Sequence, residues 1–312
     1  MKILIALGGN AILKPEEKGT EKEQLFNVHA TTDELANLVD QGHHISVTHG
    51  NGPQVGTIVR LYELAKRSLP PMPLDVCGAQ SQGMIGYLLQ QCMDNSLKRR
   101  GLNVPTVSLL TQTIVDESDP AFDRPSKPIG SFYNKRKAQQ LKAENGWRIE
   151  KDSNRGYRRV VASPNPKTVV EAMTIKKLFD LGYIVIHSGG GGIPVVRTRN
   201  GSLRGVEAVI DKDLTASMIA SLLHVDVFLI LTDVEKVYLN YGSTDQIGLD
   251  KLTVPECVTY QKEGQFATGS MAPKIEAARR FVLSSKRKAV ITSLDTALLA
   301  LKGETGTVIT YN

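Results

Sequence analysis

Residues 3–11, Ile-Leu-Ile-Ala-Leu-Gly-Gly-Asn-Ala, join a short apolar run to a glycine-rich loop, and this pattern is the strongest indication of the fold. The run from Ile3 to Leu7 is typical of a buried strand. The pattern occurs twice more: residues 45–48 lead into His49-Gly50-Asn51-Gly52-Pro53-Gln54-Val55-Gly56, and residues 183–187 lead into Ser188-Gly189-Gly190-Gly191-Gly192-Ile193-Pro194. Glycines expose successive N–H donors and allow positive φ, as a cradle for anionic oxygens requires. Three such loops predict one anion-binding crevice.

Strands and helices alternate around these loops. Residues 21–40 place apolar side chains near the spacing of one helix face, and Gly42 follows as a stop signal. Right-handed crossovers of this kind build a parallel sheet that is covered on both faces, with ligand loops at the carboxyl ends of its strands. Further elements are expected as helices at 73–93, 166–181, 213–223 and 271–284 and as strands at 183–187, 225–232, 289–292 and 306–310.

The segment from Pro120 to Ser163 interrupts this alternation. Three prolines lie close together at its start, and residues 124–159 hold 11 Lys or Arg against 3 acidic residues, in a chain of net charge +6. We therefore predict a small protruding subdomain or lid. Its aromatic residues form no stacking motif for nucleic acid, so steering of a small anionic substrate is the better interpretation of its charge.

The composition limits where the protein can act in the cell and which kinds of site it can contain. The chain has 312 residues and only three scattered cysteines, which predict neither a disulfide framework nor a metal site. No segment has the length of a membrane span or the pattern of a signal peptide. We expect a cytoplasmic protein that binds neither membrane nor nucleic acid.

Two lysines stand at expected helix starts. Lys212 lies between Asp211 and Asp213, where an N-capping aspartate beside a solvated lysine is the simpler interpretation. Lys274 follows Gly269-Ser270-Met271-Ala272-Pro273, a helix entry whose dipole favours phosphate. Two lysines converging from opposite sides would suit phosphoryl transfer, in which charge is stabilised mainly by positioning and electrostatics. Residues 264–269 have the glycine spacing of a P-loop, but Ser270 and Met271 replace its Lys-Ser/Thr pair.

These motifs together make the chain resemble the carbamate kinases of the amino acid kinase family. The resemblance spans nearly the whole chain, in order. It is carried by the three glycine loops, by Lys212 and Lys274 with their neighbours, and by the stretches Ser81-Gln82-Gly83-Met84-Ile85-Gly86-Tyr87, Lys127-Pro128-Ile129-Gly130, Arg155-Gly156-Tyr157-Arg158-Arg159-Val160-Val161 and Ile230-Leu231-Thr232-Asp233-Val234. The chain departs from the family's pattern at Ser153-Asn154, which affects only lid geometry, and at His187, where a structural histidine at a strand end is expected.

The resemblance implies a three-layer αβα sandwich with an open, mainly parallel eight-stranded sheet. It implies an N-terminal lobe at 1–205, which binds carbamate or carbamoyl phosphate, forms a homodimer and carries the protruding lid subdomain at about 120–163. A C-terminal lobe at 206–312 would bind the nucleotide.

The resemblance also implies roles for individual residues. Lys212 and Lys274 would hold the phosphates, Asp213 would orient these lysines, and Lys127 would reach in from the lid. Donors around the transferred group would come from Gly8, Gly9, Asn10, Gly50, Asn51, Gly52, Ser188, Gly189, Gly190 and Gly191. The nucleotide pocket would use Thr232, Asp233, Val234, Val237, Tyr238, Gly269, Ser270, Met271 and Pro273.

The implied activity is reversible phosphoryl transfer between carbamoyl phosphate with ADP and ATP with carbamate, without a covalent enzyme intermediate. Mg2+ would be carried by the nucleotide rather than by a protein metal site. Two alternatives stay open: a sister amino acid kinase that acts on another carboxylate or nucleotide acceptor, and a non-catalytic sensor of nucleotide or carbamoyl phosphate.

Overall fold

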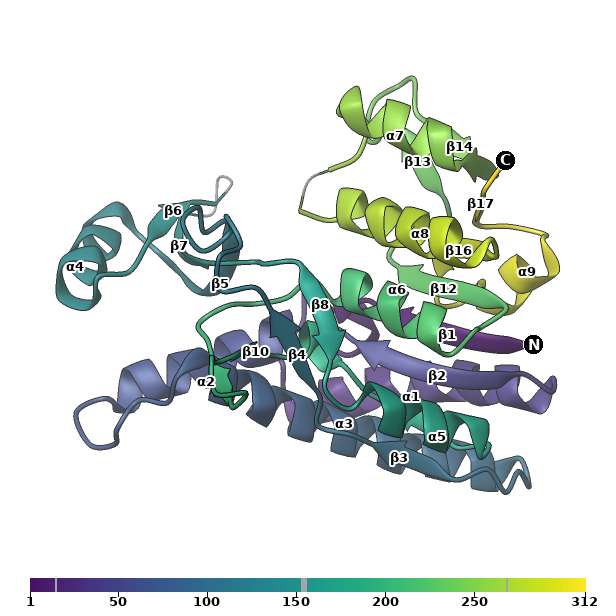
Figure 1. Ribbon diagram of the computed structural model, residues 1–312, viewed down its shortest axis with the longest axis horizontal. Coiled ribbons are helices and arrows are strands. Elements are labelled where there is room, and N and C mark those ends of the chain that lie inside the picture. The colour runs from purple at the N-terminus through teal and green to yellow at the C-terminus, as the bar shows by residue number, and fades with distance from the viewer. Residues whose placement is uncertain (15, 153–155, 268) are drawn as a thin grey trace.

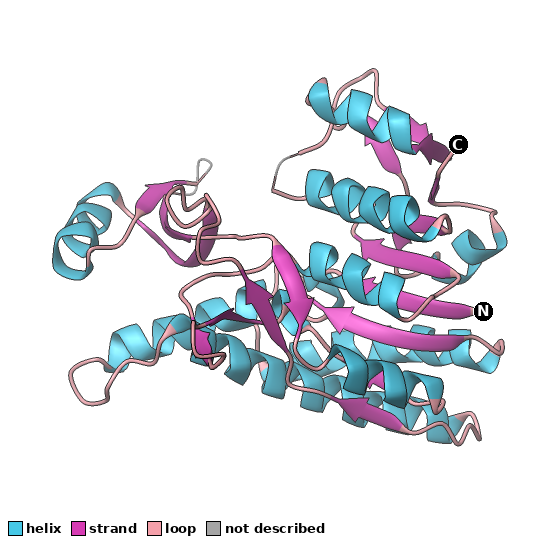
Figure 2. Ribbon diagram, viewed as in Figure 1, coloured by secondary structure: helices cyan, strands magenta, loops and turns pink. Residues whose placement is uncertain are grey.

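The computed structural model describes residues 1–14, 16–152, 156–267 and 269–312, and it has a central eight-stranded sheet between layers of helices (Figures 1 and 2). From edge to edge its strands are β15 (Lys251–Thr253), β17 (Thr307–Thr310), β16 (Lys288–Ser293), β12 (Val227–Thr232), β1 (Lys2–Leu7), β2 (His44–His49), β9 (Ile184–Ile186) and β3 (Thr106–Ser108). Within this order β16 and β17 pair antiparallel, and the other neighbours pair parallel. The expected αβα fold with a mainly parallel eight-stranded sheet is confirmed.

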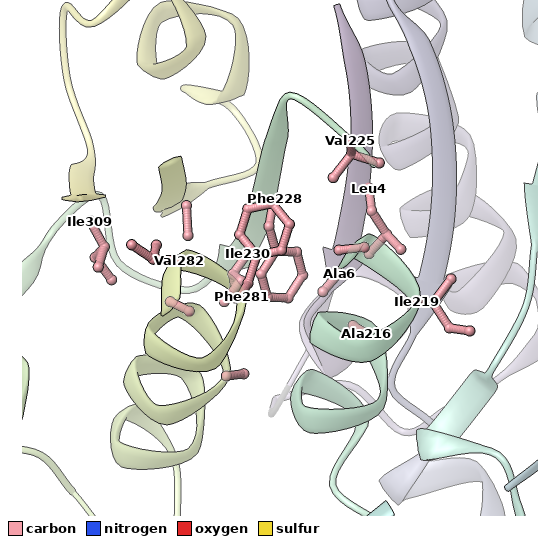
Figure 3. Packing of buried hydrophobic residues seen from close by; sticks show 14 of the residues in the cluster. Leu4, Ala6, Ala216, Ile219, Val225, Phe228, Ile230, Phe281, Val282 and Ile309 are labelled. Carbon is pink, nitrogen blue, oxygen red and sulfur yellow. The ribbon is translucent and has the colours of Figure 1, made fainter. Parts of the chain in front are cut away.

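The central strands β1 and β12 are almost wholly apolar because both of their faces are buried. In β1, Leu4 and Ala6 point to one face and Ile3, Ile5 and Leu7 to the other, and all five are fully buried. Figure 3 shows Leu4 and Ala6 beside residues of two helices that cover their face. The helices on that face are α5 (Ala172–Asp180), α6 (Lys212–Leu222), α7 (Val254–Lys262) and α8 (Met271–Ser285), and those on the opposite face are α1 (Glu21–Asp40), α3 (Leu74–Arg99) and α9 (Ala297–Lys302).

A second sheet leads away from the main body. Its strand order is β11 (Leu203–Gly205), β10 (Ile193–Arg197), β4 (Gln112–Val115) and β8 (Pro166–Val169). The chain between β4 and β8 forms a subdomain that is set apart on the left of Figure 1, and we call it the protruding subdomain. It contains β5 (Lys127–Tyr133), α4 (Lys135–Asn145), β6 (Ile149–Lys151) and β7 (Tyr157–Val161).

The protruding subdomain has a small core of its own and a contact with the main body. Ala138, Leu141 and Ile149 form that core. At its base, Ile129 and Val161 pack with residues of α2 (Gly52–Ala65), the helix that follows the second glycine loop. The first strand of the subdomain therefore lies beside the loop that ends β2.

Some elements differ from the sequence prediction. Residues 166–169 form β8 rather than the start of a helix, because the β-branched Thr168 and Val169 pair with β4 while α5 begins only at Ala172. The structure adds α7, α9 and a hairpin of β13 (Val237–Leu239) and β14 (Ile247–Leu249). The departure at Ser153-Asn154 and the adjoining Arg155 lie outside the described residues. Across the described ranges, helices that combine the length and apolarity of a membrane span are not found.

Candidate active site

The three glycine loops lie side by side because β1, β2 and β9 are neighbours and run in the same direction. Gly50 N donates to Leu7 O at 3.1 Å. Thr48 Oγ1 donates to Ser188 O at 3.0 Å. A Cβ at Gly50 would lie only 3.3 Å from Gly9 N, so the first two loops are in close contact. The loops therefore share one edge of the sheet.

A buried cluster of lysines and aspartates faces this edge. Asp213, near the start of α6, accepts from Lys212 Nζ at 2.5 Å and from Lys274 Nζ at 3.0 Å. Lys274 comes from the first turn of α8, so two helices supply one ammonium group each. Asp211 caps α6 by accepting from Asp213 N at 3.0 Å, and its other oxygen accepts from Lys127 Nζ at 3.2 Å. The cluster thus joins both lysine helices to the protruding subdomain.

Burial and charge together set the protonation of this cluster. Burial would raise the pKa of Asp213, but the two ammonium groups outweigh burial and lower that pKa. Burial, assisted by the charge of Lys274, lowers the pKa of Lys212, although Asp213 opposes the shift. Burial also acts against the charged form of Lys274, but the nearby carboxylates of Asp213 and Asp211 outweigh it and raise its pKa. A carboxylate thus holds two positive charges close together in a site of low exposure.

The cluster lines a cavity of about 190 Å3 that we call the catalytic cavity. It is lined by all four residues that were expected to be catalytic, Lys127, Lys212, Asp213 and Lys274. Four of the ten expected donors around the transferred group, Gly50, Asn51, Gly52 and Gly190, also line it, and so do three residues of the expected nucleotide pocket, Gly269, Ser270 and Pro273. Arg158 and Asp211 also line it.

Other predicted residues lie elsewhere. Gly8, Asn10, Thr232 and Asp233 line a separate hollow of about 240 Å3 beside α1. Residues that line neither this hollow nor the catalytic cavity are Gly9, Ser188, Gly189, Gly191, Val234, Val237, Tyr238 and Met271. Of these, Val237 is fully buried in β13. The structure thus gathers the lysines in one cavity and does not place all the expected nucleotide residues beside them.

The run of four glycines is explained by contacts within the protein. A Cβ at Gly190 would lie 2.2 Å from the Asn51 side chain, and a Cβ at Gly192 would lie 2.1 Å from Thr113 Oγ1. Gly190, Gly191 and Gly192 also adopt positive φ. Close approach was expected from the sequence, but the approaching atoms at these positions are the protein's own.

Burial favours the neutral form of two histidines, His49 and His187, at the strand ends that lead into the loops. Burial lowers the pKa of His49 to about 4 and that of His187 to about 3. His187 Nε2 lies 3.0 Å from Ser46 Oγ, and its Nδ1 lies 2.9 Å from Ser188 Oγ. The expected structural role of His187 agrees with these hydrogen bonds.

Sequence reasoning gave no role to several residues that hold the glycine run. Gln82 Nε2 donates to Gly189 O at 3.1 Å, and Gly191 O accepts from Thr113 Oγ1 at 2.8 Å and from Thr215 Oγ1 at 2.9 Å. Gln82 lies in one of the motifs that carry the family resemblance, which was the available signal. No local pattern marked the threonines.

Comparisons with known proteins agree with this architecture. The sequence profile of the amino acid kinase family matches residues 1–293. The chain is 49% identical to a carbamate kinase of Thermococcus kodakarensis, over 99% of this chain and 98% of that one, and 48% identical to a carbamate kinase of Clostridium perfringens, over 99% of each. The solved structure of a carbamate kinase from Giardia lamblia bound to AMP-PNP superimposes with a TM-score of 0.93 at 43% identity, covering 99% of this chain and 98% of that one. This chain belongs to the amino acid kinase family.

Proposed function

We propose that this protein is a carbamate kinase, which transfers a phosphoryl group reversibly between carbamoyl phosphate and ADP. The observation that carries the proposal is the convergence of Lys212 and Lys274 on Asp213 in a cavity that Lys127 also lines. Family membership and the full-length similarity to carbamate kinases agree with it.

The forward reaction joins two anions, which repel each other. An oxygen of the ADP β-phosphate attacks the phosphorus of carbamoyl phosphate, and the bond from phosphorus to the carbamate oxygen breaks. The electron pair of that bond leaves with carbamate, so ATP forms without a covalent enzyme intermediate. Lys212 and Lys274 neutralise the charge on the transferred group, and Asp213 fixes the position of both ammonium groups.

Lys127 acts from the carbamoyl phosphate side of the cavity. Its side chain is 34% exposed and is held by Asp211, whereas those of Lys212 and Lys274 are 12% exposed. A lysine at the first position of β5 moves with the protruding subdomain, so we propose that the subdomain brings this charge to the substrate.

The nucleotide binds on the C-terminal lobe, residues 206–312. The Giardia lamblia relative, whose structure contains AMP-PNP, supports a nucleotide site in this fold. We assign the phosphate end of that site to Gly269, Ser270 and Pro273, which line the catalytic cavity, and the base and ribose end to the residues after β12 and in β13, namely Thr232, Asp233, Val234, Val237 and Tyr238, with Met271.

Mg2+ enters with the nucleotide. Asp211 and Asp213 are engaged by lysines, and the described residues contain no cluster of three or more His, Cys, Asp or Glu suited to hold a metal ion. The donor set therefore fits an ion held mainly by nucleotide phosphates. When bound, the ion would neutralise charge on those phosphates.

The N-terminal lobe, residues 1–205, offers a surface for a homodimer. β3 is an edge strand of the main sheet. Beside it, Tyr87 of α3 is 60% exposed and Leu110 is 56% exposed, and both line one surface hollow. Exposed apolar side chains beside the edge strand of a sheet suit self-association. We propose a cytoplasmic homodimer formed through this surface.

The test is ATP formation from carbamoyl phosphate and MgADP in a coupled assay. We expect Lys212→Ala to lower turnover by about 10²-fold or more, as for loss of one transition-state donor. Lys176→Ala is the matched control, because Lys176 also pairs with an aspartate, Asp180 at 2.6 Å, but lies on α5 outside the cavity. Wild-type ATP formation no greater than in the Lys212→Ala protein would overturn the proposal, and activity with glutamate or a nucleoside monophosphate would indicate a sister kinase.

A further inference from the structure

Two adjacent arginines of β7 face in opposite directions. Successive side chains of a strand alternate between its faces, so Arg158 and Arg159 are separated although they are neighbours in sequence. Arg159 donates to Glu207, and its guanidinium carbon lies 4.4 Å from the centre of the Trp147 ring. Arg159 thus lines the hollow between α2 and the protruding subdomain, while Arg158 lines the catalytic cavity.

We propose that Arg158 is a further anion-binding residue of the active site, and that it holds carbamoyl phosphate from the side of the protruding subdomain. The inference rests on the proposed function. It adds a fourth cation to the three lysines, and it gives a role to the first residue of the Arg158-Arg159 pair.

The position of Arg158 suits a substrate that enters beneath the subdomain. Arg158 lines the catalytic cavity together with Lys127, and it also lines an adjoining hollow of about 700 Å3 between α2 and β5. Arg60 lines the same hollow, together with the acidic residues Glu17 and Asp152. A small anion that entered here would pass Arg60 and Arg158 before it reached the lysines.

The hydrogen bonding of Arg158 leaves donors for a ligand. Its Nη1 donates to Asp152 Oδ2 at 3.1 Å, and its guanidinium carbon lies 5.0 Å from the centre of the Phe132 ring. Its Nε is buried and has no hydrogen-bond partner among the residues that the structure describes. A guanidinium carries five N–H donors in a planar fork that matches phosphate oxygens, so one carboxylate does not use them all.

The charges of the cavity favour an anion beside Arg158. Four cations line the cavity, Lys127, Arg158, Lys212 and Lys274, against the carboxylates of Asp211 and Asp213. Those two carboxylates are engaged by the lysines. Arg158 pairs outside the cavity lining, with Asp152, and its side chain remains 21% exposed. An incoming phosphate or carbamoyl group can therefore accept from it without displacing a cavity carboxylate.

The experiment measures initial rates with carbamoyl phosphate and MgADP varied in turn, for the wild type and for Arg158→Gln and Arg158→Lys. We expect Arg158→Gln to raise KM for carbamoyl phosphate about tenfold or more, with KM for MgADP changed less than about twofold. Arg158→Lys should recover part of the loss, because lysine keeps the charge without the fork. Inorganic phosphate should compete with carbamoyl phosphate more weakly in Arg158→Gln, by a similar factor.

Arg148→Gln is the control, since Arg148 lies in the same subdomain, is 52% exposed and does not line the catalytic cavity. It should behave as the wild type. An unchanged KM for carbamoyl phosphate in an active Arg158→Gln protein would overturn the assignment. An equal rise in both KM values, with a lowered Tm that Arg158→Lys restores to the wild-type value, would also overturn it, because that result indicates a structural role. A wild type that makes no ATP would instead overturn the proposed function.

Discussion

Replacement of Asp213 by asparagine tests whether one buried carboxylate holds the two phosphate lysines. The Asp213 side chain is 4% exposed, and each lysine that it accepts from is 12% exposed. Removing the charge leaves two buried ammonium groups close together without their shared counter-ion. Removal of one partner from a buried ion pair costs about 3–5 kcal/mol, which is a large part of an ordinary stability of about 5–15 kcal/mol. We expect Asp213→Asn to lower Tm at pH 7 by on the order of 10 °C.

The effect of Asp213→Asn on Tm should depend on pH through the pKa values of the two lysines. Asparagine cannot offset burial, so the folded-state pKa values of Lys212 and Lys274 should both fall below the unfolded value. The unfolded chain then binds more protons than the folded chain in the interval between those values, and stability rises with pH there by up to about 1.4 kcal/mol per pH unit for each lysine. The Tm difference between Asp213→Asn and the wild type should therefore narrow between pH 7 and about pH 9.5.

The assay is thermal unfolding across this pH range, together with turnover at pH 7. Turnover should fall by about 10²-fold, because displaced lysines no longer match the transferred group. The control is Asp250→Asn, since Asp250 accepts from Lys236 at 2.6 Å but is 77% exposed, and an exposed pair contributes at most about 1 kcal/mol. A normal Tm in Asp213→Asn, or a Tm difference that stays constant with pH, would show that Asp213 is not the shared counter-ion of the two lysines.

Three further predictions concern the loop, the histidines and the subunit surface. Gly190→Ala should destabilise the protein by about 1–3 kcal/mol and reduce turnover, because φ is +63° and the new Cβ would overlap Asn51. Gly78→Ala in α3 is the control: its new Cβ meets no atom within 4 Å, so it should be neutral or stabilising. Urea unfolding compares the free energies of unfolding of the two variants. The pKa of His187 is lowered to about 3, so its contribution to stability is present above the unfolded pKa near 6.5 and is lost as pH falls below that value. The free energy of unfolding of His187→Asn should therefore decline less steeply between pH 6.5 and pH 4 than that of the wild type. Urea unfolding at several pH values measures this slope, and an equal slope in both proteins would contradict the prediction. Tyr87→Glu should convert the proposed dimer to monomer in light scattering after size exclusion, and a wild type that is already monomeric would exclude the dimer.

Local patterns predicted the elements that carry strong periodicity or clear end signals. The helix expected at 21–40 is α1 with the same bounds, because an apolar stripe ends at Gly42 and Thr20 forms a capping box with Glu23. The helix α7 was missed, although Thr253 and Glu256 form the same kind of box. The error at 166–169 has another cause: β8 exists because β4 is available to pair with it, and pairing between distant segments leaves little local signal.

Sequence patterns alone established the α/β fold, the position of the glycine loops after strands and, through the motifs around the lysines, the resemblance to the amino acid kinase family. They follow from the periodicity of the apolar residues and from glycine and lysine motifs that few other residue types could replace. The family resemblance already implied that Asp213 orients Lys212 and Lys274, and the structure adds the two hydrogen bonds. The pairing of Lys127 with Asp211, and the separation of Arg158 and Arg159 into different cavities, came from the three-dimensional structure alone. Such contacts join helices and strands far apart in the chain, so packing on the common sheet sets their distances.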